Sequence, residues 1–120
     1  MQGLRTTIYK VEDLQKAKAW YAEAFRAKPY LDEPFYVGFN IGGYELGLLP
    51  SEESNAGKTG NVLSYWGVEE IESEYHRLIN LGTKEHEPPN NVGEELVVAS
   101  VRDPWGNVLA LIYNPHFKLE

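Results

Sequence analysis

One glutamate in this chain has the sequence setting of a catalytic acid or base. Glu45 lies in the run Tyr44–Leu49. Strand alternation places it on one face with Gly47, while Leu46 and Leu48 point to the other. Because the leucines should face the protein core, Glu45 should lie on the opposite face, where a carboxylate with a raised pKa could act as a general base. A solvated glutamate at the rim of that face is the alternative, and a one-residue register error would move Glu45 off it.

The other residue types that support catalysis show no useful spacing. His76, His86 and His116 are too scattered in pattern to converge on one ion, and each is typical of an isolated surface or half-buried histidine. The 120 residues contain no cysteine, which excludes disulfides, thiolate metal sites and a cysteine nucleophile. The sequence also shows neither a Ser-His-Asp arrangement nor a phosphate-binding glycine loop.

Several side chains could line a binding site for a small molecule. Alternation puts Tyr65 on the same face as Leu63 and Asn61, and together with Thr6 they would place a few polar groups on an apolar wall. That mixture suits a small or flat organic ligand, although Tyr65 could instead be a core aromatic. Trp105 falls in a predicted turn, where its ring could stack on a ligand, pack against a partner subunit or simply be exposed.

The bulk composition describes an ordinary globular domain with an acidic balance. At 120 residues with 42% hydrophobic content, a single domain with a sizeable core is expected. The net charge of -7 disfavours nucleic acid and anionic membranes as partners. No apolar run approaches the ~20 residues of a membrane span, and the first residues lack a signal-peptide core. We therefore expect a cytoplasmic protein.

The pattern predicts the same order of elements twice. In the first half, Asp13 should cap a helix that ends before Pro29, and Gly42-Gly43 should close a hairpin. The second half opens its helix at Val68–Ile71 and ends it near Gly82. The predicted strands cover residues 4–10, 29–33, 35–41, 44–49, 61–67, 83–87, 95–102 and 108–113, with a linker at 50–59 and a loop at 88–93.

A turn near the end of the chain organises this prediction. Asp103-Pro104-Trp105-Gly106-Asn107 should reverse the chain into an apolar strand, since proline and glycine fix such a turn. The run Gly43–Leu49 echoes the sequence that follows the turn, which indicates a duplicated module. We therefore predict an α+β fold in which one domain, residues 1–120, consists of two βαβββ modules at 4–49 and 60–113.

These motifs resemble the vicinal oxygen chelate superfamily, which includes glyoxalases, bleomycin-resistance proteins and extradiol dioxygenases. The resemblance rests on Val11–Leu14 with Trp20-Tyr21, on Val68–Ile71 with Gly82, and on the Asp103–Asn107 turn. It implies that the two modules form a cupped sheet around a cavity, toward which Glu45 would point.

Enzymes of that superfamily hold a divalent metal through the first and last strands of each module. Carried onto this sequence, the first-strand positions are Thr6 and either Leu63 or Asn61, and the last-strand positions are Gly47 and Ala110. None is an imidazole or a carboxylate, whereas a metal site needs three or four converging donors. The resemblance therefore implies the scaffold, and we expect no metal or other cofactor.

The function that we predict is binding of a small, largely apolar organic molecule in the cup. Its site residues would be Thr6, Glu45, Gly47, Asn61, Leu63, Tyr65, Trp105 and Ala110. Family analogy favours a homodimer. The alternatives are a metal-dependent lyase of the lactoylglutathione lyase type or a dioxygenase with unusual ligands, a metal-free enzyme that uses Glu45, and an assembly module with a vestigial cup.

Overall fold

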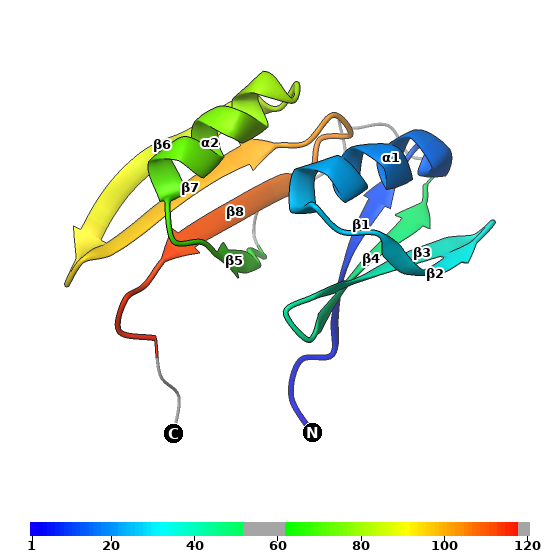
Figure 1. Ribbon diagram of the computed structural model, residues 1–120, viewed down its shortest axis with the longest axis horizontal. Helices are drawn as coiled ribbons and strands as arrows, with labels where there is room; N and C mark the ends of the chain where they lie inside the picture. The colour runs from blue at the N-terminus through cyan, green and yellow to red at the C-terminus, as the bar shows by residue number, and fades with distance from the viewer. Residues whose placement is uncertain (52–61, 118–120) are drawn as a thin grey trace. The chain divides into compact units, whose positions relative to one another are not determined.

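The computed structural model contains two successive βαβββ arrangements (Figure 1). It describes residues 1–51 and 62–117. The elements are β1 (Thr6–Val11), α1 (Leu14–Phe25), β2 (Pro29–Glu33), β3 (Tyr36–Ile41), β4 (Tyr44–Pro50), β5 (Tyr65–Gly67), α2 (Ile71–Asn80), β6 (Lys84–Gly93), β7 (Leu96–Arg102) and β8 (Val108–Tyr113). The sheets have the orders β1-β4-β3-β2 and β5-β8-β7-β6, and the chain divides into compact units Met1–Gly57 and Lys58–Glu120. The predicted α+β fold with two tandem βαβββ modules is confirmed.

Local sequence signals determine the elements of the first unit. The Asp13 side chain accepts a hydrogen bond from the backbone N–H of Lys16 at 3.1 Å and so caps α1, as predicted. The helix ends where Arg26 adopts a left-handed conformation with φ of 51°. Gly42 and Gly43, with φ of 61° and 92°, form the tight turn between β3 and β4. This backbone suits the twist of a two-residue hairpin.

The core of the first unit lies between α1 and one face of its sheet. Leu46 and Leu48 of β4 are completely buried on this face, together with Phe39 of β3 and Tyr21 of α1. The rings of Tyr9 and Tyr21 stack there with centroids 5.7 Å apart. Because side chains alternate along a strand, Glu45 and Gly47 lie on the opposite side of the sheet from Leu46 and Leu48. We call this side the helix-free face.

The second unit repeats this packing with α2. Its core side chains are Ile71, Tyr75, Leu78, Ala99, Val101, Leu109 and Leu111. Gly82 follows the helix with φ of 97°, a conformation that glycine adopts at little cost, so the predicted helix end is confirmed. The phenol of Tyr75 donates a hydrogen bond to Glu85 at 2.6 Å and joins α2 to β6. Burial and this bond to a carboxylate raise the pKa of Tyr75.

The predicted loop at residues 88–93 is wrong. β6 runs without a break from Lys84 to Gly93 and includes Pro88 and Pro89. It pairs only with β7, at the edge of its sheet, and its pairing is interrupted by register shifts. An edge strand needs backbone donors on one side only, so it can contain prolines that would disrupt a central strand.

The first strand of the second unit is shorter than predicted. β5 covers only Tyr65–Gly67, while residues 62–64 form no ladder with β8. Its pairing with β8 alone gives this segment few backbone hydrogen bonds, since β5 also lies at a sheet edge. Asn61 and most of the predicted linker, residues 52–59, lie outside the described residues. The module limits 4–49 and 60–113 therefore stay a prediction.

The Asp103–Asn107 turn joins β7 to β8 as predicted. Asp103 is only 3% exposed, and its carboxylate accepts hydrogen bonds from the backbone N–H groups of Trp105 and Asn107 at 2.9 and 2.8 Å. The Asn107 amide donates a third at 3.0 Å. Gly106, with φ of 86°, allows the reversal. Asp103 therefore has a structural role, because its carboxylate holds the turn together.

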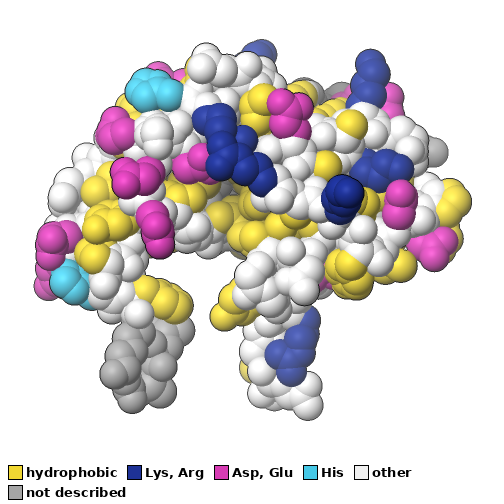
Figure 2. Space-filling view, viewed as in Figure 1, with side chains coloured by type: hydrophobic (Ala, Val, Ile, Leu, Met, Phe, Trp, Pro, Cys, Tyr) yellow, Lys and Arg dark blue, Asp and Glu magenta, His cyan; other side chains and the backbone are white. Residues whose placement is uncertain are grey.

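The distribution of charge agrees with the acidic composition. On the face shown in Figure 2, acidic side chains gather over the second unit, at the left of the view. α2, β6 and the turn after β6 each contain two glutamates. Such a surface disfavours an anionic partner there. Among the residues that the structure describes, no helix is long and apolar enough to cross a membrane.

Candidate functional site

Glu45 is the centre of a polar cluster on the helix-free face of the first sheet. The phenol of Tyr36 donates a hydrogen bond to Glu45 Oε1 at 2.6 Å, and the phenol of Tyr30 donates one to Oε2. Thr6 on β1 is the direct register partner of Glu45 on β4. We call Thr6, Tyr30, Tyr36 and Glu45 the first-sheet cluster. It contains two residues predicted for the site and two that the sequence analysis missed.

Two glycines make room for the tyrosine rings of this cluster. A Cβ added at Gly47 would lie 2.8 Å from Tyr36 Cζ and closer still to the phenol oxygen. A Cβ added at Gly38 would lie 2.9 Å from Glu45 Oε2 and 3.2 Å from Tyr30 Cε1. Gly38 and Gly47 are register partners on β3 and β4. The phenol of Tyr36 thus fills the space that a side chain at position 47 would need.

The cluster stabilises the ionised form of Glu45. The Thr6 hydroxyl has the largest effect, followed by the Tyr30 and Tyr36 phenols, and together they lower the pKa of Glu45 despite partial burial. The sequence analysis suggested a raised pKa, which is wrong because the hydroxyl donors outweigh burial. Conversely, the Glu45 carboxylate raises the pKa of Tyr30, while burial and then the carboxylate raise the pKa of Tyr36. At neutral pH the cluster is an anion held by neutral phenols.

Thr6 has an unusual position in this cluster. Its Oγ1 is buried, and it forms no hydrogen bond of acceptable geometry with the described residues. The hydroxyl nevertheless lies near enough to affect the pKa of both Glu45 and Tyr36. A buried hydroxyl without a full hydrogen bond costs free energy, and Thr6 bears that cost beside Glu45.

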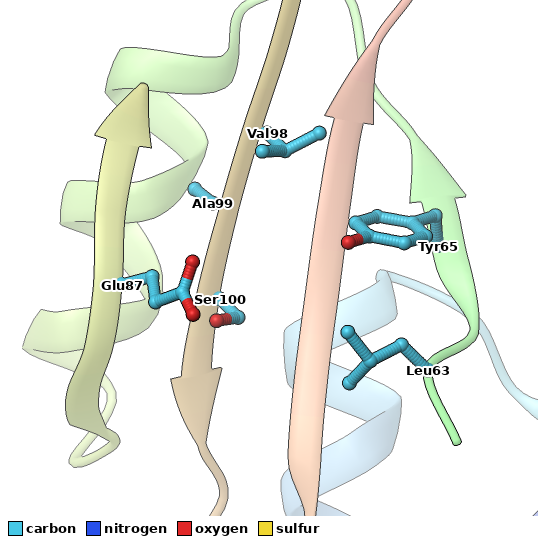
Figure 3. Close-up of a pocket in the computed structure, with 6 residues that line it drawn as sticks. All are labelled: Leu63, Tyr65, Glu87, Val98, Ala99 and Ser100. Carbon is cyan, nitrogen blue, oxygen red and sulfur yellow. The ribbon is translucent and has the colours of Figure 1, made fainter. Parts of the chain in front are cut away.

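The second unit has a small pocket on the equivalent face of its sheet. Figure 3 shows its lining: Leu63, Tyr65, Glu87, Val98, Ala99 and Ser100. Leu63 and Tyr65, both predicted site residues, come from β5 and the segment before it and are 42% and 45% exposed. Glu87 belongs to β6, and Ser100 belongs to β7. The pocket combines apolar walls with two polar groups, but its volume of about 20 Å³ is that of a shallow dent on this surface.

A serine and a histidine meet beside this pocket. His86 Nδ1 lies 2.7 Å from Ser100 Oγ, and Ser100 is only 6% exposed. Neither residue was predicted for the site. Alternation does place Ser100 on the face of Val98, but a register shift between Glu85 and Glu87 hides the direction of His86 from any sequence pattern.

The remaining predicted site residues have separate locations. Ala110 is buried and pairs with Tyr65 in the β5–β8 ladder, so it lies beside the pocket without lining it. Trp105 is half-buried in the turn after β7. The other two histidines are apart from the pocket: His76 packs against Tyr75, and His116 lies 2.9 Å from Glu95.

The fold agrees with a family comparison. A model of the glyoxalase, bleomycin resistance protein and dioxygenase superfamily matches residues 3–111. The chain belongs to this superfamily. Among curated proteins, no sequence matches this chain.

Solved structures of the superfamily share the fold at low sequence identity. A glyoxalase-related enzyme from Fulvimarina pelagi has a TM-score of 0.79 and 18% identity, covering 100% of this chain and 94% of that one. The fosfomycin resistance protein FosX from Listeria monocytogenes, solved with Mn(II) and a sulfate ion, has a TM-score of 0.80 and 17% identity over 97% of this chain and 93% of its own. Lactoylglutathione lyase from Agrobacterium tumefaciens has a TM-score of 0.76 and 20% identity, with coverage of 100% and 99%. These likenesses concern the fold alone.

The superfamily's metal does not fit the residues found here. Thr6, Gly47, Ala110 and either Leu63 or Asn61 occupy the positions that the resemblance assigns to ligands. Asn61 lies outside the described residues, and of the others only Thr6 carries an oxygen donor in its side chain. Within residues 1–51 and 62–117, no group of three or more histidine, cysteine, aspartate or glutamate side chains could hold a metal ion. A carboxylate at position 47 would also meet the Tyr36 ring. The donor set therefore lacks the ligands that a divalent ion requires.

Proposed function

We propose that this member of the superfamily binds a small, largely apolar organic molecule on the helix-free faces of its sheets, without a divalent metal. One observation supports the proposal most strongly. The Tyr36 phenol occupies the space of a side chain at position 47 and is fixed there by its hydrogen bond to Glu45. A ligand position for metal is thus replaced by aromatic surface, which favours binding of an organic ring over coordination of an ion.

The second unit carries a candidate binding surface of its own. Leu63 and Tyr65 present exposed apolar surface beside Ser100 and Glu87. A few polar groups on an apolar wall orient a ligand, while burial of its apolar surface provides most of the affinity. Thr6, Glu45 and Gly47 in one unit, and Leu63, Tyr65 and Ala110 in the other, stay the proposed binding residues.

The geometry favours binding over acid–base catalysis by Glu45. A general base works best when its pKa lies near the operating pH, whereas the hydroxyl groups around Glu45 lower its pKa. A carboxylate held in this way is a weak base and a good fixed charge. The cytoplasmic location and the homodimer expected from the sequence stay part of this proposal, and light scattering of the purified protein would test the dimer.

A thermal-shift screen of aromatic and hydrophobic compounds in the presence of EDTA tests the proposal. A compound present at 100 times its Kd should stabilise the protein by about 2.7 kcal/mol, which is a readily measured rise in Tm. Saturating Mn²⁺, Zn²⁺ or Ni²⁺ should add nothing to that rise. The proposal fails if no compound class stabilises the protein, or if stabilisation appears only after a metal is added.

A further inference from the structure

The first-sheet cluster carries a negative charge that has no cationic side-chain partner among the described residues. The ion pairs of this part of the chain, such as Lys18–Asp32 and Glu74–Arg77, do not involve Glu45. The hydroxyl groups that lower its pKa are all neutral. Lys10 lies on the same face of β1 but four residues from Thr6, which is about 13 Å along a strand.

The hydrogen bonds around Glu45 leave a cation as the best additional partner. Each carboxylate oxygen already accepts a bond from a phenol, Oε1 from Tyr36 and Oε2 from Tyr30. Each oxygen keeps a second lone pair, so a neutral donor on a ligand could still bind it. A positive charge would still gain the full attraction of the carboxylate, since hydrogen bonds from phenols do not cancel its charge.

The surroundings of the carboxylate suit an organic cation better than a hydrated metal ion. Tyr30 is 62% exposed, and its electron-rich ring stands beside the charge. Aromatic rings attract ammonium groups through their faces. Ile8, 42% exposed on the same face of the sheet, adds apolar surface next to Thr6. A ligand with a charged end and an apolar body would match both features.

We propose that the first-sheet cluster recognises the ammonium group of a small organic cation, whose apolar remainder lies along the helix-free face. The Glu45 carboxylate supplies the charge, and the rings of Tyr30 and Tyr36 supply the aromatic contact. This inference rests on the proposed binding function and specifies its ligand class as cationic.

Titration calorimetry with two matched probes tests the charge preference. The probes are 2-phenylethylammonium and its neutral analogue 2-phenylethanol, each titrated into the full chain at pH 7 in EDTA. The wild-type protein should bind the cation about tenfold more tightly, which corresponds to about 1.4 kcal/mol. Glu45→Gln should reduce the preference to less than twofold, because the amide keeps the shape but loses the charge. Glu23→Gln, an exposed position on α1, removes the same charge elsewhere and should keep the tenfold preference.

A second variant keeps the test valid if Glu45→Gln does not fold. Tyr30→Leu changes an exposed ring on edge strand β2, and it should lower the preference for the cation about threefold. A wild-type protein that binds the alcohol as tightly as the cation, or binds neither probe, overturns the inference. An unchanged preference in Glu45→Gln also overturns it. The proposed function fails separately, if the wider screen finds no binder or finds stabilisation only after a metal is added.

Discussion

Gly47→Ala should displace the Tyr36 ring and weaken the first-sheet cluster. The new Cβ would lie 2.8 Å from Tyr36 Cζ and 3.1 Å from Cε1, so the ring must move. Moving it breaks the 2.6 Å hydrogen bond to Glu45. A bond to a charged group contributes about 1.5–3 kcal/mol, and we take about 1 kcal/mol here because the group is partly solvated.

Two further terms complete the expected change in the free energy of unfolding. Repacking the ring costs about 1 kcal/mol, at the low end for overpacking because a side chain rather than backbone gives way. Alanine recovers about 0.5 kcal/mol by restricting the unfolded chain. The net loss is about 1.5 kcal/mol, or a fall in Tm of about 6 °C for a chain of this size. Urea unfolding followed by circular dichroism measures it.

A double-mutant cycle separates this mechanism from a general effect of alanine in β4. In a Tyr36→Ala background the ring is absent, so Gly47→Ala should be neutral or slightly stabilising. The coupling energy between the two sites should then be about 1.5–2 kcal/mol. An equal loss of stability in both backgrounds would refute the account of Gly47, because it would show that Tyr36 is not what position 47 accommodates.

Three other changes test separate parts of the structure. Glu45→Gln should remove the stability that the ionised carboxylate contributes. In the wild type this stability is present above the ordinary glutamate pKa of 4.5 and is lost as the pH falls through the lowered folded-state pKa. The Tm values of wild type and variant should therefore converge on acidification, and a constant difference from pH 7 to pH 3 would contradict this. Asp103→Ala should lower the free energy of unfolding by about 3 kcal/mol, because it leaves the three donors of the turn without their acceptor. Urea unfolding measures this change, and a loss below about 1 kcal/mol would show that the turn does not depend on the carboxylate. Tyr75→Phe should cost about 1 kcal/mol by removing the bond to Glu85, and Glu85→Gln in the same background should then add almost nothing.

The sequence predicted most of the fold because its signals are local. Asp13 and Gly82 mark helix ends by their own chemistry, and Gly42-Gly43 fixes a hairpin register by turn geometry. Alternation then places Glu45 correctly on the helix-free face, since Leu46 and Leu48 leave only one register that buries them. The prolines of β6 misled the prediction because their cost depends on whether the strand lies at an edge, which only the assembled sheet determines.

The candidate site was harder to predict because it depends on which strands are neighbours. Tyr30 reaches Glu45 from β2, across a register shift after Pro29 that alternation does not reveal. One signal was available: Gly38 and Gly47 are glycines inside strands, and such glycines mark a close approach by another group. The direction of the Glu45 pKa shift depends on Thr6, which was predicted for the site, and on the Tyr30 and Tyr36 phenols, which were not. Without the register of the strands, the sequence could not give the sign.

The metal content of the purified protein gives an independent check. Elemental analysis should find no stoichiometric Zn, Ni, Fe or Mn, because the positions that resemble the superfamily's ligands offer too few donors. One equivalent of any of these ions that survives dialysis would show that other side chains bind it and would favour a metal-dependent enzyme.

The most direct test of metal-independent binding is calorimetry with the best compound from the thermal-shift screen. The compound is titrated into the protein first in EDTA and then in excess Mn²⁺. Our account predicts the same Kd under both conditions, because the proposed binding groups, such as the aromatic and hydroxyl groups around Glu45, need no metal. Binding that disappears in EDTA and returns with Mn²⁺ would contradict it.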